Sequence, residues 1–182
     1  LRKDPIDIKA LMQTALGVKA LHLTSFHPAM SLIQMMVDCT DPVNFAPYWL
    51  ECGPDSRPKH IFVTEGTGDH ATPGLTTETM TGAGGLPLVV PLCNRSEAHD
   101  LRGLEPLSWP VSGNVETADG MVTAASKQWE GESHWVAFNE LEARALWQRF
   151  FATLHEGVPT LDQGDLLVYT SAHLSPGDTC ED

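Results

Sequence analysis

The sequence predicts an α/β fold, because a short apolar run and a glycine-rich turn lie between segments with helical periodicity. Residues 60–65 read His-Ile-Phe-Val-Thr-Glu, which has the length and composition of a buried strand. The segments before and after it repeat apolar side chains every three or four positions, as amphipathic helices do. With 182 residues and 42% apolar content, the chain can bury the core of one domain and does not resemble a disordered segment.

Charge and composition exclude several classes of function. The chain has 24 acidic and 11 basic side chains, which gives a net charge of −13. Such a chain repels phosphate backbones and anionic lipid, so neither nucleic acid nor a membrane surface is an expected partner. No apolar run approaches the roughly 18 residues of a transmembrane segment. The cysteines lack C-x-x-C spacing; the nearest pair is Cys39 and Cys52, and the disulfides and the compartment stay open: Cys39, Cys52, Cys93 and Cys180.

Residues 1–58 are expected to form a helical, lid-like region. One helix is expected from Asp4 to Leu16 and a second from Pro28, followed by an ordered loop over 38–58. The chain starts at Leu1 without an initiator Met or an export signal, so it is expected to be a processed product or a fragment. Three methionines are expected to pack in the core or under a lid, although they could also line a slot for an acyl group: Met30, Met35 and Met36.

Residues 59–156 are expected to hold the sheet and its flanking helices. After the strand come a helix from about Pro73 to Ala83, a second extended piece at 86–92 and a polar insertion at 93–113. Asp119-Gly120 predicts a type I′ hairpin turn that joins strands at 115–117 and 121–128.

The last strong helical pattern runs from about Asn139 to Leu154 and is expected to place three aromatic side chains in the core, Trp147, Phe150 and Phe151. Residues 157–182 are expected to form an irregular tail.

Two turns combine a strand end, glycine and an ionisable side chain. Asp69 follows the 60–65 strand on a turn where Gly66 and Gly68 can adopt backbone conformations that other residues resist. His134 lies in the turn between the last strand and the last amphipathic helix. Ligands of open α/β sheets bind at the carboxyl ends of the strands, so the two turns are expected to meet there. A carboxylate that holds one ring nitrogen of a histidine makes the other nitrogen a general base.

These two turns resemble parts of the α/β-hydrolase family. Lys59–Pro73 is similar to the family's acid turn, with an apolar strand, Gly-x-x-Asp and a Pro that opens the next helix. Gln128–Phe138 is similar to its last strand and Gly-x-x-His turn, although Glu132-Ser133 stands where the family usually has a small residue. The order of acid before histidine also matches. The resemblance covers about residues 59–155 and implies a partial α/β-hydrolase sheet, made of its C-terminal strands with flanking helices.

The resemblance implies serine-dependent hydrolysis, most commonly of a carboxylic ester as in esterases and lipases. In that reaction His134 would be the general base and then the general acid, and Asp69 would orient it. No cofactor or metal is implied. The expected partners are a small-molecule ester and the N-terminal half of the hydrolase, from the same precursor or a separate chain.

The family's nucleophile is missing from these residues, since no Gly-x-Ser-x-Gly occurs. Ser25, Ser112 and Ser133 do not stand on a strand–turn–helix pattern, so none replaces it. The chain alone is therefore expected to be inactive.

Three alternatives remain open. Gly66, Gly68 and Ala71 fit a dinucleotide fingerprint that could bind NADP, but Asp69 and Pro73 oppose it. A metal site built from Asp69, His70 and another histidine lacks ligand spacing, whichever of these supplies it: His22, His27, His60 or His99. The third alternative is a non-catalytic interaction module, in which the 60–65 strand offers an unpaired edge to a partner.

Overall fold

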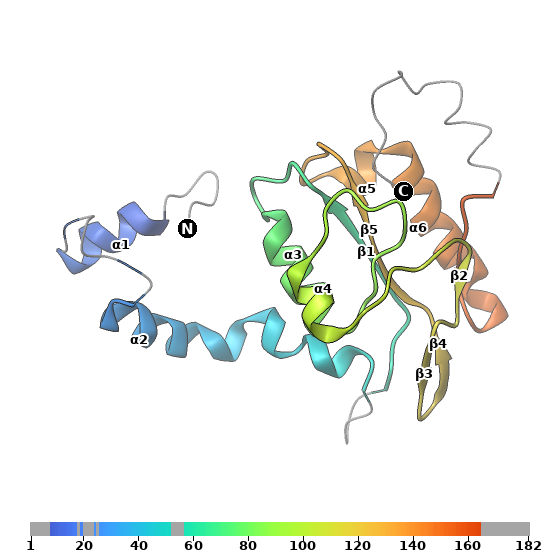
Figure 1. The fold of residues 1–182 in the computed structure, drawn as a ribbon, viewed down its shortest axis with the longest axis horizontal. Helices are drawn as coiled ribbons and strands as arrows, with labels where there is room; N and C mark the ends of the chain where they lie inside the picture. Colours follow the sequence, from blue (N-terminus) through green and yellow to red (C-terminus); the bar gives the residue numbers. More distant parts are fainter. Residues whose placement is uncertain (1–7, 18, 20–23, 25, 52–56, 165–182) are drawn as a thin grey trace.

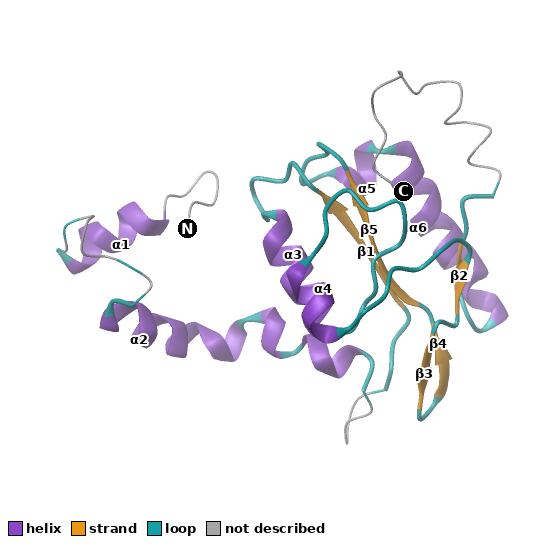
Figure 2. Cartoon of the chain, viewed as in Figure 1, coloured by secondary structure: helices purple, strands orange, loops and turns teal. Residues whose placement is uncertain are grey.

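The computed structural model describes residues 8–17, 19, 24, 26–51 and 57–164. Helices and strands both occur in it, so the fold is mixed α/β (Figures 1 and 2). In chain order the helices are α1 (Ile8–Leu16), α2 (Pro28–Val37), the 3₁₀ helices η2 (Asp38–Thr40), η3 (Pro42–Asn44) and η4 (Ala46–Trp49), α3 (Gly74–Ala83), α4 (Glu97–Arg102), α5 (Val136–Asn139), α6 (Leu141–Thr153) and η5 (Leu154–Glu156). The strands are β1 (Ile61–Gly66), β2 (Val111–Ser112), β3 (Val115–Thr117), β4 (Gly120–Val122), β5 (Ala124–Trp129) and β6 (Thr160–Leu161).

The first two helices extend away from the sheet (Figure 1). α1 ends at Leu16 as predicted, while its expected start at Asp4 lies outside the described residues. α2 begins at Pro28 as predicted, but it buries none of its residues. Met35 and Met36 are 71% and 76% exposed, so the expectation that they pack in the core is wrong. The lid role of this region stays a prediction, and the expected loop after α2 contains η2, η3 and η4.

The centre of the fold is a parallel pair of strands. β1 and β5 pair over six residues, from Ile61 opposite Ala124 to Gly66 opposite Trp129. At the other edge of β5, Leu88 bridges Ser126 in the same direction, so the extended piece predicted at 86–92 continues the sheet through isolated bridges. Among the described residues β1 pairs with β5 alone, which makes β1 an edge strand.

The predicted hairpin forms, but it is shorter than expected and its turn is of another type. β3 pairs with β4 only as far as Val122, and the following residues leave the hairpin to become β5. A type I′ turn needs two residues with positive φ, whereas only Gly120 has one (118°). Instead, the Thr117 hydroxyl accepts a hydrogen bond from the Asp119 N–H (3.3 Å) and donates one to the Gly120 carbonyl (2.6 Å).

The two faces of the central strands differ in chemistry. On the α6 side, Phe62 of β1 and Ala125 of β5 pack against Phe150, and Trp129 packs with Leu146. The expectation that Phe151 belongs to this core is wrong, because its side chain lies on the outer face of α6 and is 62% exposed. On the α3 side, the strands present polar side chains, which return below.

The connecting segments are more regular than expected. The 93–113 insertion contains α4 and β2, and β2 pairs with β6, which opens the segment predicted as an irregular tail. Residues 165–182 of that tail lie outside the described residues.

Cys93 is disulfide-bonded and Cys39 is free and exposed, so the Cys39–Cys52 pair is not formed. Over the described residues, no helix combines the length and apolar character needed to cross a membrane.

Candidate functional site

Two turns meet at the carboxyl ends of the parallel strands. One follows β1 and carries Asp69; the other follows β5 and carries His134. Backbone hydrogen bonds join the turns, since the Gly68 N–H donates to the Glu132 carbonyl (2.9 Å). The Thr67 hydroxyl adds a second link by accepting from the Gly131 N–H (2.9 Å). The predicted convergence of the two turns at one edge of the sheet is therefore confirmed.

Gly66 and Gly68 allow this close approach because they have no side chain. A Cβ on Gly66 would lie 2.4 Å from the Glu132 carbonyl oxygen, and one on Gly68 would lie 2.6 Å from that of Gly131. Neither glycine has a positive φ. The expectation that they supply unusual backbone conformations is therefore wrong, and their role is to let two backbones touch.

Asp69 is held from both sides of its carboxylate. Oδ1 accepts hydrogen bonds from the N–H groups of Ala71 (2.7 Å) and Thr72 (2.9 Å), while Oδ2 lies 2.8 Å from His134 Nδ1. The side chain is only 10% exposed. Burial on its own raises the pKa of Asp69, but the donors from Thr72, His134 and Ala71 outweigh it and lower the pKa below its usual value. The group therefore faces His134 as a fixed anion at neutral pH.

His134 is oriented by that contact and open on its other side. With Nδ1 on Asp69, Nε2 makes no hydrogen bond to any described residue, and the side chain is 46% exposed. The ring stands edge-on to Trp135, with centroids 5.3 Å apart, and Trp135 in turn lies 6.1 Å from Phe138. These two aromatic side chains are 59% and 61% exposed, so an apolar rim borders the imidazole. The arrangement can accept a proton at Nε2 and keep the resulting imidazolium next to a carboxylate.

No nucleophile completes the pair within the described residues. No serine, threonine or cysteine side chain there is hydrogen-bonded to His134. The Ser112 hydroxyl donates to the Pro159 carbonyl (3.3 Å), and Ser25 lies outside the described residues. Ser133 is exposed and precedes the histidine directly in the chain. The structure thus brings Asp69 and His134 together, and their catalytic roles stay a prediction.

The rival sites are less well built. A dinucleotide fingerprint needs free N–H groups for its pyrophosphate, but the Ala71 and Thr72 N–H groups donate to Asp69. For a metal, the described residues contain no cluster of three or more His, Cys, Asp or Glu side chains. The candidate histidines are scattered: His27 caps α2, the ring of His60 accepts from the Thr123 N–H, His99 lies in α4 and His22 is outside the described residues.

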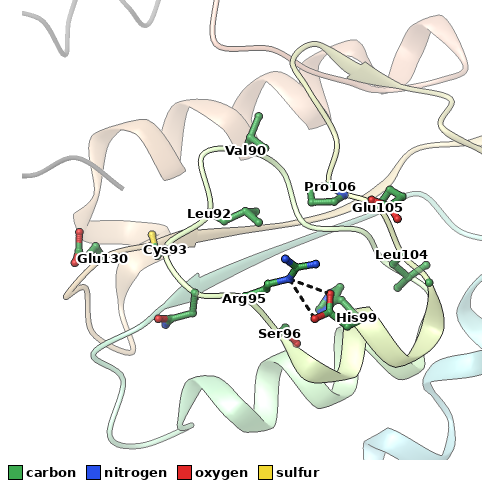
Figure 3. A pocket seen from close by; sticks show the side chains of 13 residues that line it. Val90, Leu92, Cys93, Arg95, Ser96, His99, Leu104, Glu105, Pro106 and Glu130 are labelled. Atoms are coloured by element: carbon green, nitrogen blue, oxygen red, sulfur yellow. Dashed lines mark hydrogen bonds and ion pairs between the residues drawn. The ribbon is translucent and has the colours of Figure 1, made fainter. Parts of the chain in front are cut away.

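A hollow of about 1160 Å³ lies between α4 and the 90–94 and 103–106 segments (Figure 3). Its wall includes the ring of His99, which is 3% exposed and whose Nε2 lies 2.9 Å from the Leu86 carbonyl oxygen. Burial lowers the pKa of His99, so the ring is neutral at pH 7. Neither Asp69 nor His134 lines this hollow, so it is separate from the dyad.

Sequence reasoning missed the polar side chains under the Asp69 turn, Glu65, Glu78 and Gln128, although all three are buried. The available signal was a Glu at the end of an otherwise apolar strand.

Comparison with known proteins adds no assignment: no family model matches the chain, and no curated protein and no solved structure is found to be similar to it.

Proposed function

We propose that this chain supplies the acid and the histidine of a serine-dependent hydrolase that acts on a carboxylic ester. In this proposal Asp69 and His134 form two members of a catalytic triad, and a serine outside these 182 residues is the third. The resemblance of both turns to the α/β-hydrolase family supplies the reaction class, and ester cleavage is its commonest form.

The observation that carries the proposal is the hydrogen bond from His134 Nδ1 to Asp69 Oδ2, 2.8 Å long, between turns that follow parallel neighbouring strands. The two N–H donors on Oδ1 fix the carboxylate before any substrate binds. A catalytic acid–histidine pair requires such preorganisation, because the carboxylate and the imidazole then need no reorientation, and its cost in free energy, during the reaction. A surface ion pair without a function needs neither the two backbone donors nor an open Nε2.

Each group has a defined task in the proposed reaction. His134 Nε2 removes the proton from the serine hydroxyl as the oxygen attacks the ester carbonyl carbon, and it then gives that proton to the departing alcohol. Asp69 holds Nδ1–H and stabilises the imidazolium that exists between the two transfers. A water molecule then replaces the alcohol, and the same two transfers release the acid. The exposed rings of Trp135 and Phe138 favour an apolar group next to the reacting atoms.

The roles are tested by substitution in the complete protein, with p-nitrophenyl esters of short and medium acyl chains as substrates. His134→Ala and Asp69→Asn are each expected to lower kcat by about 10³-fold or more, because the proton acceptor or its orientation is lost. His70→Ala and Ser133→Ala are matched controls, since both residues are exposed and lie beside the dyad in the chain. Near-normal ester hydrolysis by both dyad variants would show that the assigned roles are wrong.

The position of the nucleophile is tested separately. A fluorophosphonate reacts covalently with activated serines, and peptide mass spectrometry then identifies the labelled residue. The label is expected on a serine outside residues 1–182, and it is expected to disappear when His134 is replaced by Ala. A label on Ser112 or Ser133 would contradict the proposal that this chain lacks the nucleophile.

A further inference from the structure

A layer of buried polar side chains lies beneath the Asp69 turn, on the α3 side of the strands. Glu65 of β1, Glu78 of α3 and Gln128 of β5 are 3%, 8% and 1% exposed. Other polar side chains on α3, on α4 or just before it are also buried: Thr77, Thr81, Ser96 and His99. Burying two carboxyl groups side by side costs folding free energy unless something compensates for their charge.

The orientation of the Gln128 amide is fixed by the backbone. Its Oε1 accepts hydrogen bonds from the N–H groups of Cys93 (3.2 Å) and Asn94 (3.0 Å). Its Nε2 must therefore face the carboxyl groups, and it lies 3.5 Å from Glu65 Oε1 and 3.4 Å from Glu78 Oε1. One amide thus joins the two carboxyl groups, while Glu65 Oε2 is buried without a hydrogen-bond partner among the described residues.

Glu65 connects the two ends of the loop that carries Asp69. The loop leaves β1 immediately after Glu65 and Gly66 and ends where α3 begins at Gly74. Glu65 Oε1 lies so close to Gly74 that a Cβ there would be only 2.9 Å from it. The carboxyl of Glu65 therefore lies at the foot of the loop, against its far end and next to α3.

Within the part of the chain that the structure describes, no cation compensates for the charge of the two carboxyl groups. Among the described ion pairs none includes Glu65 or Glu78. Lys127 of β5 is turned to the other face, where its Nζ donates to the Pro91 carbonyl (2.9 Å) and lies 5.7 Å from the Trp129 ring. On the α4 side, His99 is neutral at pH 7 and Arg95 is paired with Asp100 near the surface.

We propose that Glu65 and Glu78 hold one proton between them, and that in this form they act as positioning residues that keep the Asp69 loop against the His134 turn. Loss of the proton as the pH rises through neutrality puts two negative charges side by side under the loop and loosens it. The inference concerns the Asp69–His134 contact itself and does not depend on whether the site hydrolyses esters.

The direction of the pH effect follows from where the proton sits. Burial and then the charge of Glu78 raise the pKa of Glu65 from 4.5 to about 7, although the hydrogen bond from Gln128 opposes this. Burial also raises the pKa of Glu78. Because the folded pKa is above the unfolded value, the contribution to stability is fully present below pH 4.5 and is lost as the pH rises through about 7. Between pH 5 and pH 8 the unfolding equilibrium constant is expected to rise roughly 70-fold from this group.

The test compares the complete protein with Glu65→Gln, which keeps the shape of the side chain and removes its titration. Unfolding by urea is followed at several pH values from 5 to 8, and the His134 Nδ1–H signal is followed by NMR. As the pH rises, the unmodified protein is expected to lose unfolding free energy relative to Glu65→Gln. After correction for the intrinsic, hydroxide-catalysed rate, its His134 Nδ1–H proton is expected to lose protection from exchange, whereas Glu65→Gln is expected to keep that protection. Glu116→Gln is the matched control, since Glu116 is exposed on the β3–β4 hairpin, and it should behave like the unmodified protein.

The proposal is overturned if the unfolding free energy of Glu65→Gln falls between pH 5 and pH 8 by as much as that of the unmodified protein. More generally, a difference in unfolding free energy between the two proteins that stays constant from pH 5 to 8 overturns it, because other titrating groups, such as the buried His99, are common to both proteins. If Glu65→Gln does not fold, hydrogen exchange of the unmodified protein decides: after correction for the intrinsic rate, residues 66–73 should lose protection between pH 6 and 8 while α6 does not. Equal behaviour of the two segments contradicts the proposal. Ester hydrolysis is not measured in any of these arms, so failure of the proposed function leaves their outcome unchanged.

Discussion

Replacing Gly66 by alanine should separate the two halves of the dyad. The new Cβ would lie 2.4 Å from the Glu132 carbonyl oxygen and 2.6 Å from that of Ser133, whereas ordinary contacts begin near 3.4 Å. Both neighbours are backbone atoms, so no flexible side chain can move aside. The turns must therefore separate by about 1 Å.

A displacement of that size is enough to break the contact. The bond from His134 Nδ1 to Asp69 Oδ2 is 2.8 Å long, and adding about 1 Å takes it beyond hydrogen-bond reach. Gly66→Ala should cost about 1–3 kcal/mol of unfolding free energy, as overpacking usually does. If the dyad is catalytic, kcat should fall by about 10²-fold, the usual consequence of a 1 Å misplacement.

Urea unfolding and the NMR signal of the His134 Nδ1–H proton measure the two effects. Gly103→Ala is the control: it strains the backbone, because Gly103 has a φ of 65°, but a Cβ there meets nothing within 4 Å, so it tests strain without a close approach. It should lose about 1 kcal/mol and keep the His134 signal. A Gly66→Ala protein whose Nδ1–H signal is unchanged would refute the reasoning from close approach.

Three further predictions concern other parts of the molecule. Because the pKa of Asp69 is lowered in the folded protein, its contribution to stability is present above about pH 4 and is lost as the pH falls through the pKa of the folded state. The difference in unfolding free energy between the unmodified protein and Asp69→Asn should therefore shrink between pH 5 and pH 2, as urea unfolding at several pH values can measure. Phe150→Ala should cost about 3–5 kcal/mol because its ring is 5% exposed, while Phe151→Ala, at 62% exposed, should cost less than about 1 kcal/mol; equal losses in thermal unfolding would contradict the assignment of the core. Iodoacetamide should label Cys39 in the folded, unreduced protein but Cys93 only after reduction, as peptide mass spectrometry can show.

The parts of the fold that local sequence determines were predicted well. β1 is an apolar run of strand length, and α3 and α6 have helical patterns bounded by Pro, Gly or a capping side chain, so each was placed within a few residues of its observed bounds. Asp69 and His134 were paired because each follows a strand and a glycine. The prediction that they meet needed only that the two strands be parallel neighbours, which they are.

The parts that depend on distant residues were not predicted. β5 reads Ala-Ala-Ser-Lys-Gln-Trp, which lacks the apolar character of a buried strand, yet all six residues are buried because it lies between β1 and the 87–89 segment. Its Lys and Gln are satisfied by the Pro91 carbonyl and by the Cys93 and Asn94 N–H groups. Such partners are invisible in the sequence, so the segment was assigned to the preceding hairpin.

The constraint on the glycines of the Asp69 turn also comes from distant residues. Gly66 and Gly68 are expected from the sequence to adopt backbone conformations that other residues resist, but the observed constraint comes from the backbone of residues 131–133, more than 60 positions later in the chain. The exposure of Met35 and Met36 has the opposite cause: an apolar helical pattern indicates a helix, but it does not say that another element covers it.

The parallel pairing of β1 with β5 also determines when the dyad can arise. Asp69 and His134 are 65 positions apart, and a parallel pair must close that whole span of chain before its contacts compensate for the lost entropy. The helices can form from contacts between near neighbours, whereas the contact between the acid and the histidine needs this long loop to close first. During synthesis, therefore, the contact between Asp69 and His134 can form only after the turn that follows β5, which carries His134, has left the ribosome.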